Sequence, residues 1–213
     1  MCIRDRARQP ERRRRDLSTE EIVATALDLA AREGSSQLTM RRLADACGVT
    51  PMALYHHVAD KEELLTLLAD RVVGEALLST RADGSWQERL VDFACHYRRG
   101  FLANPAAAEV LLRRPVLSEN LARCTEFMFQ LFSEGGISGT AMAEATDAFV
   151  LLLHGSITND LTRPPEVRRQ LLDFAEPGEL RRLEERMATY SHRDGEERFR
   201  LAAGWMLDGL TRG

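Results

Sequence analysis

The sequence predicts an all-α protein, in which an N-terminal three-helix domain with a helix-turn-helix is joined by a connecting helix to a larger helical body. Alanine, leucine, arginine and glutamate crowd the chain, and no stretch is dominated by valine, isoleucine, threonine or tyrosine. Apolar residues recur at helical spacing behind residues that can cap a helix. The 213 residues are 44% hydrophobic, which is enough for a buried core and excludes a disordered linker.

A capping box over residues 18–21 predicts the start of the first helix. In this motif the Ser18 hydroxyl accepts from the backbone amide of Glu21, and the glutamate carboxylate accepts from the serine amide. An apolar stripe follows at helical spacing, and Gly34 can take the left-handed conformation that ends a helix. We therefore expect a helix over residues 19–33.

Two short helices follow, and a threonine caps each of them. Thr39 precedes a helix over residues 40–46 that Gly48 ends, and Thr50 precedes a helix that opens with Pro51 and extends to residue 57.

The junction of these helices satisfies the packing requirements of a helix-turn-helix. Two helices that cross at a tight turn need a small residue where they approach, a flexible residue in the turn and an apolar plug. Ala44, Gly48 and Leu54 occupy these places. The face of the third helix that points outward is uncharged and thin enough to enter a major groove. An ordinary helical hairpin is the alternative reading.

The remaining helices are predicted in the same way. A capping box at residues 60–63, followed by an apolar stripe, predicts a connecting helix over residues 61–79, and Ser85 caps a helix that ends near Asn104. Prolines and glycines separate further helices, which we expect near residues 105–113, 118–133, 139–161 and 195–211. Between the last two lies an Arg/Glu-rich pair of segments split by Pro177 and Gly178.

Charge is distributed unevenly, although the net charge is only −4. Residues 1–16 hold seven arginines against three acidic residues and should form a disordered arm, which either stays solvated or seeks phosphate. We expect a helix-turn-helix domain over residues 17–62 and a larger helical body over residues 63–213. Residues 61–213 are acidic, with 24 acidic against 19 basic residues, which disfavours a sequence-indifferent nucleoid binder.

Several other classes of protein are disfavoured. The four cysteines (Cys2, Cys47, Cys95 and Cys124) are far apart and form no CxxC pair, so we expect reduced thiols and neither a metal site nor a disulfide. No apolar stretch is long enough for a membrane span, and we expect a cytoplasmic protein with no membrane partner. The GxSxG, HExxH and P-loop motifs are absent, so we expect no catalytic residues and no cofactor. An all-α enzyme or small-molecule-binding protein, in which the hairpin is only structural, is the alternative.

Residues 18–70 resemble the N-terminal domain of TetR/AcrR-type transcriptional regulators. The resemblance lies in Leu38–Ala44, Gly48–Val49, Leu54–Val58 and Asp60–Leu65. It implies a homodimeric repressor that is released from a palindromic operator in double-stranded DNA when a small-molecule effector binds the C-terminal body.

The resemblance also implies contacts with DNA. Thr39 and Arg41 match positions that contact the backbone or a base, and Lys61 matches a lysine that clamps a phosphate. The base-reading positions are mainly apolar, so we expect contacts with thymine methyl groups from Met52 or Ala53 and a share of shape readout. The complete predicted set is Thr39, Arg41, Arg42, Thr50, Pro51, Met52, Ala53, Tyr55, His56, His57 and Lys61.

Two helices of the body are candidates for a dimer interface. The helix near residues 139–161 is apolar on all sides and must be buried all round, and the last helix has one apolar face. The resemblance implies that both pair with their copies across a two-fold axis, whereas burial within one protomer is the alternative. The predicted interface residues are Ala145, Phe149, Leu152, Leu153, Phe199, Ala203, Met206 and Leu210.

A candidate effector pocket lies between these helices and the rest of the body. It consists of Phe93, His96, Tyr97, Phe101, Met128, Phe132, Phe149, His154 and Asn159. The two histidines stand on otherwise apolar faces, where each must find a hydrogen-bond partner in the protein or on an effector. Their spacing does not indicate a metal.

Overall fold

The computed structural model describes residues 17–113, 116–162 and 193–212, and every regular element in these ranges is a helix. The all-α prediction is therefore confirmed. The basic arm and the segments around Pro177 and Gly178 lie outside the described residues. The elements are α1 (Thr19–Glu33), η1 (Ser35–Gln37), α2 (Met40–Cys47), α3 (Pro51–Tyr55), α4 (Lys61–Ser79), α5 (Trp86–Ala103), α6 (Pro105–Arg113), α7 (Glu119–Glu134), α8 (Gly139–Thr162) and α11 (Gly195–Arg212).

Local capping chemistry accounts for where the helices begin. Reciprocal capping boxes at Ser18 and Ser85 start α1 and α5, as the sequence predicted. At α4 only half of the predicted box forms. The Asp60 carboxylate accepts from the Glu63 amide at 2.8 Å, as predicted. The Glu63 carboxylate accepts from the amide of Ala59, one residue before the cap, at 2.6 Å.

The third helix is shorter than predicted and ends at Tyr55, not at residue 57. The Leu54 carbonyl accepts from the amides of His57 and Val58 at 3.0 and 3.1 Å, which turns the chain. This turn places Val58 in the hydrophobic core, where it is fully buried.

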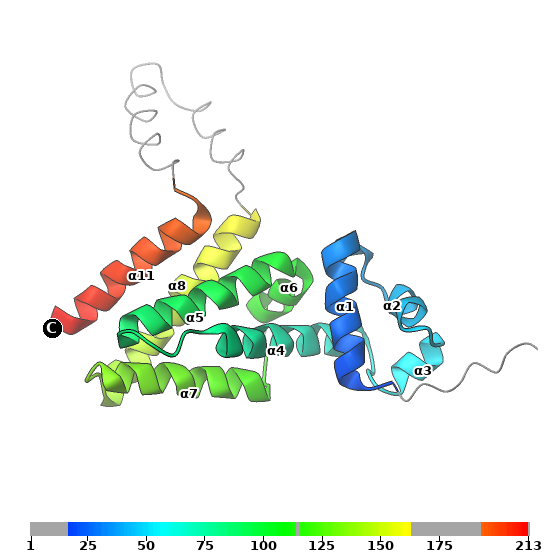
Figure 1. Ribbon diagram of the computed structural model, residues 1–213, viewed down its shortest axis with the longest axis horizontal. Coiled ribbons are helices and arrows are strands. Elements are labelled where there is room, and N and C mark those ends of the chain that lie inside the picture. Colours follow the sequence, from blue (N-terminus) through cyan, green and yellow to red (C-terminus); the bar gives the residue numbers. More distant parts are fainter. Residues whose placement is uncertain (1–16, 114–115, 163–192, 213) are drawn as a thin grey trace, which may run out of the picture.

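The helices form two lobes that share α4. Figure 1 shows α1, α2 and α3 grouped at one end of α4, with α5, α6 and α7 beside the rest of that helix and α11 farther from it, next to α8. Helix α4 packs on α1 as well as on α5, α6 and α7. One hydrophobic core runs through both lobes. Within the described residues, no helix is long and apolar enough to cross a membrane.

Removal of the hairpin plug should destabilise the N-terminal lobe. Leu54 is fully buried, so we expect Leu54→Ala to lower the free energy of unfolding by about 2–5 kcal/mol through lost burial and the cavity it leaves. The matched control is Met52→Ala on the same helix, at a side chain that is 70% exposed, and it should change stability by less than about 0.5 kcal/mol. Urea denaturation followed by circular dichroism measures both, and equal losses would contradict this packing.

Candidate nucleic-acid interface and effector cavity

The turn between α2 and α3 is held by a small buried core and a left-handed glycine. Leu43, Ala44 and Leu54 are fully buried between the helices. Gly48 has φ +70° and ψ +26°, a conformation that costs any residue with a Cβ atom. The Val49 amide donates to the Ala44 carbonyl at 3.0 Å and closes the turn. These contacts fix the direction in which α3 leaves α2.

This arrangement turns the polar and large side chains of α3 toward solvent. Leu54 is the buried residue of the helix, whereas Met52 is 70% exposed and Tyr55 is 46% exposed. A large apolar side chain exposed in this way contributes nothing to the core and is available to a partner. Figure 1 shows α2 and α3 on the side of α1 that faces away from the body, where neighbouring helices do not cover them.

The predicted DNA-contacting residues lie on α2, on α3 and its C-terminal turn, and at the start of α4. Of the eleven, Ala53 is half-buried and all the others are exposed. Two of the hydroxyls are already engaged, because Thr39 accepts from the Arg42 amide and Thr50 accepts from the Ala53 amide, both at 3.2 Å. A capping hydroxyl can still donate its own hydrogen to a phosphate oxygen.

Arg42 has a partner within the domain that the sequence pattern does not reveal. Its guanidinium donates to both carboxylate oxygens of Glu33 at 2.9 and 2.7 Å, which ties α2 to the end of α1. The hydrogen bonds with Arg42 lower the pKa of Glu33, and those with Glu33 raise the pKa of Arg42. Arg41 and Lys61 are exposed on the same lobe, and neither forms an ion pair with another residue that the structure describes. The Arg42 guanidinium is therefore engaged with α1, and a DNA phosphate would have to share it with Glu33.

The body contains an uncharged cavity of about 220 Å³ between α5, α6, α7 and α8. Its lining is mostly apolar and consists of Phe93, Tyr97, Leu111, Val116, Leu121, Cys124, Thr125, Met128, Val150, Leu153 and His154. The Tyr97 hydroxyl lies 3.0 Å from His154 Nε2 and forms a hydrogen bond across it. Burial raises the pKa of Tyr97 and lowers the pKa of His154, so both side chains are neutral at pH 7. Burial also raises the pKa of the Cys124 thiol to about 12, which keeps this wall uncharged.

Four of the nine residues predicted for the effector pocket line this cavity, namely Phe93, Tyr97, Met128 and His154. Phe101, Phe132 and Phe149 are fully buried core residues instead, and Phe132 packs edge-on against Phe149 at 6.5 Å between ring centroids. His96 lies outside the cavity, with its Nε2 3.8 Å from the Asp92 carboxylate. Asn159 lines a separate groove beside α11.

These differences arise because helical spacing identifies a face and not the depth at which each side chain lies. Of the wall that α7 contributes, only Met128 was predicted from the sequence. Leu121, Cys124, Thr125 and Met128 all line the cavity at i, i+3, i+4 and i+7. That spacing is the signal that would have found them.

The structure places most of the predicted dimerisation residues inside the protomer. Ala145, Phe149, Leu153, Phe199 and Ala203 are buried within the protomer, and Leu152, Met206 and Leu210 are half-buried. Phe149 and Phe199 contact each other at 6.4 Å between ring centroids and join α8 to α11. The apolar side chains that these helices expose are Leu151, at 73%, and Trp205, at 69%. Because α8 is apolar all round, its sequence could not indicate which face turns inward.

Comparison with known proteins identifies the family of this chain. The family model described as "Bacterial regulatory proteins, tetR family" matches residues 22–68. The model described as "Tetracyclin repressor-like, C-terminal domain" matches residues 79–212. The chain belongs to the TetR family. Its members are regulators and not enzymes, so the alternative of an enzyme with a merely structural hairpin is excluded.

Individual relatives are similar along most of the chain. An HTH-type transcriptional regulator of Saccharopolyspora erythraea is 31% identical over 153 residues, which is 70% of this chain and 65% of the relative. The HTH-type transcriptional repressor Rv1353c of Mycobacterium tuberculosis is 26% identical over 159 residues, which is 72% of this chain and 61% of the relative. The chain thus spans less than two thirds of the length of these relatives.

The structure of the Streptomyces coelicolor TetR family protein ActR in complex with actinorhodin matches with a TM-score of 0.73 at 25% identity. The match covers 93% of this chain and 99% of that one.

Among the described residues of this chain, no group of His, Cys, Asp and Glu side chains could hold a metal ion.

The buried His154 predicts a pH dependence of stability. Burial lowers its pKa in the folded state below the unfolded value, so its contribution is complete above pH 6.5 and is lost as the pH falls through the lower folded pKa. We expect the free energy of unfolding to decrease from pH 7 to pH 5, and His154→Asn to flatten this slope. The control is His57→Asn, at an exposed position, which should keep the slope. An unchanged slope in His154→Asn would contradict the assignment.

Proposed function

We propose that this chain is a transcriptional repressor that binds a palindromic operator as a homodimer and is released when a small molecule enters the α5–α8 cavity. The observation that carries the proposal is the exposed face of α3, which the buried elbow holds away from the rest of the lobe. The name of Rv1353c as a repressor and the complex of ActR with actinorhodin support it. In this proposal residues 17–62 bind DNA, and residues 63–213 bind the effector and the second protomer.

On DNA, α3 would lie in the major groove. Met52 and Ala53 carry the methyl and methylene groups that can contact thymine methyls, and Arg41 can donate to a base. Thr39, Tyr55, His57 and Lys61 are suited to phosphate oxygens, with Thr50, Pro51 and His56 at the edges of the same face. Because α3 holds no Arg, Asn or Gln, sequence-dependent DNA shape should carry part of the specificity.

In the dimer, the outward faces of α8 and α11 would pair with their copies. Leu151 and Trp205 are the largest exposed apolar side chains of these helices. Gly155 on α8 and Gly204 on α11 have open space where a Cβ atom would stand, which allows a second backbone to approach closely. An isologous contact covers both patches at once and would set the two α3 helices about 34–36 Å apart, one turn of duplex.

The chemistry of the cavity indicates the class of effector. Its lining is neutral, so a charged molecule would lose its hydration without gaining a partner. An uncharged and largely apolar molecule fits, with one polar group placed at the Tyr97–His154 pair. Its binding would shift α4 and thereby the spacing of the two α3 helices.

Substitutions on the DNA-binding face should separate affinity from specificity. We expect Tyr55→Ala to weaken binding to all DNA sequences and Arg41→Ala also to reduce discrimination, each by about 1–3 kcal/mol, because one loses a phosphate contact and the other a base contact. Mobility-shift titrations at two salt concentrations measure this, with the region upstream of the chain's own gene compared with unrelated DNA. Arg113→Ala, at an exposed residue of α6, is the control. Retained affinity in both variants would refute the DNA-binding assignment and leave a small-molecule-binding protein with a structural hairpin.

A charge on the α8–α11 face should prevent dimerisation. We expect Trp205→Asp to yield monomers at micromolar concentration in analytical ultracentrifugation, because the aspartate would be buried without a partner at the two-fold axis. Leu78→Asp, at an α4 side chain that is also highly exposed, should leave the dimer intact. A stable dimer of Trp205→Asp would move the interface elsewhere.

A further inference from the structure

A cluster of hydrogen bonds joins the middle of α4 to the first turn of α7. The Asn120 amide group donates through Nδ2 to the Asp70 carboxylate at 2.8 Å and to the Asp70 carbonyl at 3.2 Å. The Asn120 backbone amide donates to the same carboxylate at 3.1 Å. This amide belongs to the first turn of α7, where helical amides have no partner within the helix, so Asp70 caps α7 from outside. We call these three contacts the Asn120–Asp70 clamp.

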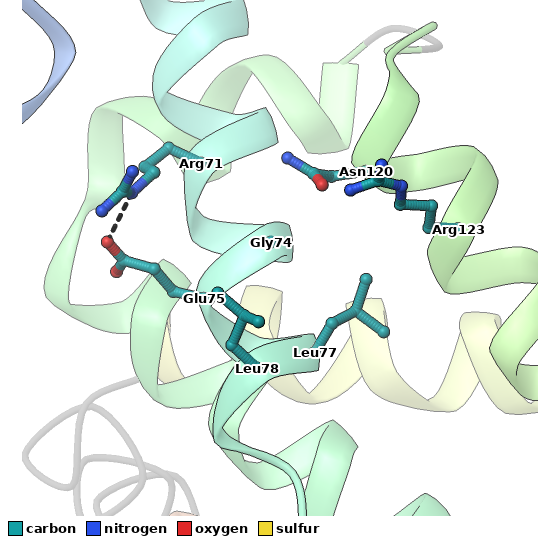
Figure 2. A pocket seen from close by; sticks show the side chains of 7 residues that line it. All are labelled: Arg71, Gly74, Glu75, Leu77, Leu78, Asn120 and Arg123. Atoms are coloured by element: carbon teal, nitrogen blue, oxygen red, sulfur yellow. Dashed lines mark hydrogen bonds and ion pairs between the residues drawn. The ribbon is translucent and has the colours of Figure 1, made fainter. Parts of the chain in front are cut away.

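A glycine on α4 makes room for the clamp. A Cβ atom at Gly74 would lie 2.8 Å from Asn120 Nδ2 and 3.0 Å from its Cγ, closer than packed atoms allow. Glycine inside a helix is less stable than alanine, so the helix alone would favour a different residue here. Figure 2 shows the Asn120 side chain reaching from α7 toward α4 beside Gly74. Gly74 and Asn120 thus form a matched pair.

The same turn of α7 also faces the cavity. Leu121, the residue after Asn120, lines the cavity together with Cys124 and Thr125. The first turns of α7 therefore touch the cavity on one side and α4 on the other. An occupant that displaces Leu121 must move Asn120 with it, because both belong to one helix.

The clamp differs in kind from the other contacts of α4. The contacts with α5 and α6 involve buried apolar side chains, whose attraction is not directional and tolerates sliding. Hydrogen bonds weaken steeply when distance and angle change, so the clamp fixes the position of α4 along α7. Since α4 also packs on α1, a shift at Asp70 reaches the DNA-binding lobe.

We propose that Asn120 is the positioning residue through which the occupancy of the cavity sets the placement of α4 and hence the affinity for DNA. This inference rests on the proposed function. Asn120 does not itself line the cavity, and it lies on α7, outside the proposed DNA-binding residues. In this role Asn120 couples the cavity to the DNA-binding face. Its loss should leave both sites functional but should remove the effect of cavity occupancy on the affinity for DNA.

A double-mutant cycle tests the clamp without an identified effector. Val150 lines the cavity from α8, so Val150→Phe fills the cavity with an aromatic ring as an effector would. The readout is the Kd for the DNA fragment upstream of the chain's own gene, measured by fluorescence anisotropy. We expect Val150→Phe to raise this Kd at least tenfold in the native background and less than threefold in the Asn120→Ala background.

Further variants distinguish a positioning role from a structural one. Gly74→Ala should act like Asn120→Ala, because its methyl group displaces the amide of Asn120. Arg123→Ala is the matched control on α7, where Arg123 pairs with Glu119 of the same helix, and it should leave the tenfold effect intact. Thermal melting and sedimentation establish that each variant is folded and dimeric. Leu111→Phe, which fills the cavity from α6, replaces Val150→Phe if that variant does not fold.

The outcomes separate the two proposals. An equal rise in Kd with and without Asn120 would overturn the clamp and leave the effector-release function standing. No rise for either cavity-filling variant in the native background, with DNA binding intact, would overturn both, because the cavity would then have no influence on DNA.

Discussion

The burial of α4 against both lobes is the constraint on which the rest of the structure depends. Its buried residues are Leu64, Leu68, Ala69, Val72, Val73 and Ala76, and they face partners on several sides. The helix therefore cannot move relative to the body without disturbing α1, and it cannot bend locally without losing hydrogen bonds. A change in the packing around the cavity is in this way converted into a change in where α3 points. The direction of the short α3 relative to the body depends on the same constraint, because the lobe that contains α3 is held to the body by α4.

The balance of charge on the two lobes fits a division of labour. The face of α3 itself is neutral, so its attraction to DNA would come from Arg41, Lys61 and the hydroxyls around it, while the apolar side chains supply selectivity. The cavity is neutral as well, because burial keeps Tyr97, His154 and Cys124 uncharged. The two proposed sites are linked through helix packing and not through long-range electrostatics.

Features that depend on neighbours in sequence could be predicted, and features that depend on distant neighbours could not. The bounds of α1 and α4 follow from Ser18, Asp60 and helical spacing, because a cap is a hydrogen bond between residues three apart. The hairpin elbow was predictable for the same reason. In contrast, the pairing of Arg42 with Glu33 and the inward face of α8 are decided by tertiary contacts. The cavity was predicted only in part, since an apolar stripe looks alike whether it fills a core or lines a void.

Footprinting of the region upstream of the chain's own gene tests the central claim most directly, because it reads the geometry of the bound protein on the DNA. The claim is that a symmetric dimer presents two α3 helices in register with the duplex. It predicts two protected half-sites related by two-fold symmetry, with their centres about 10–10.5 base pairs apart or a multiple of this, on one face of the DNA. A single protected half-site, or diffuse protection without symmetry at saturating protein, would contradict it.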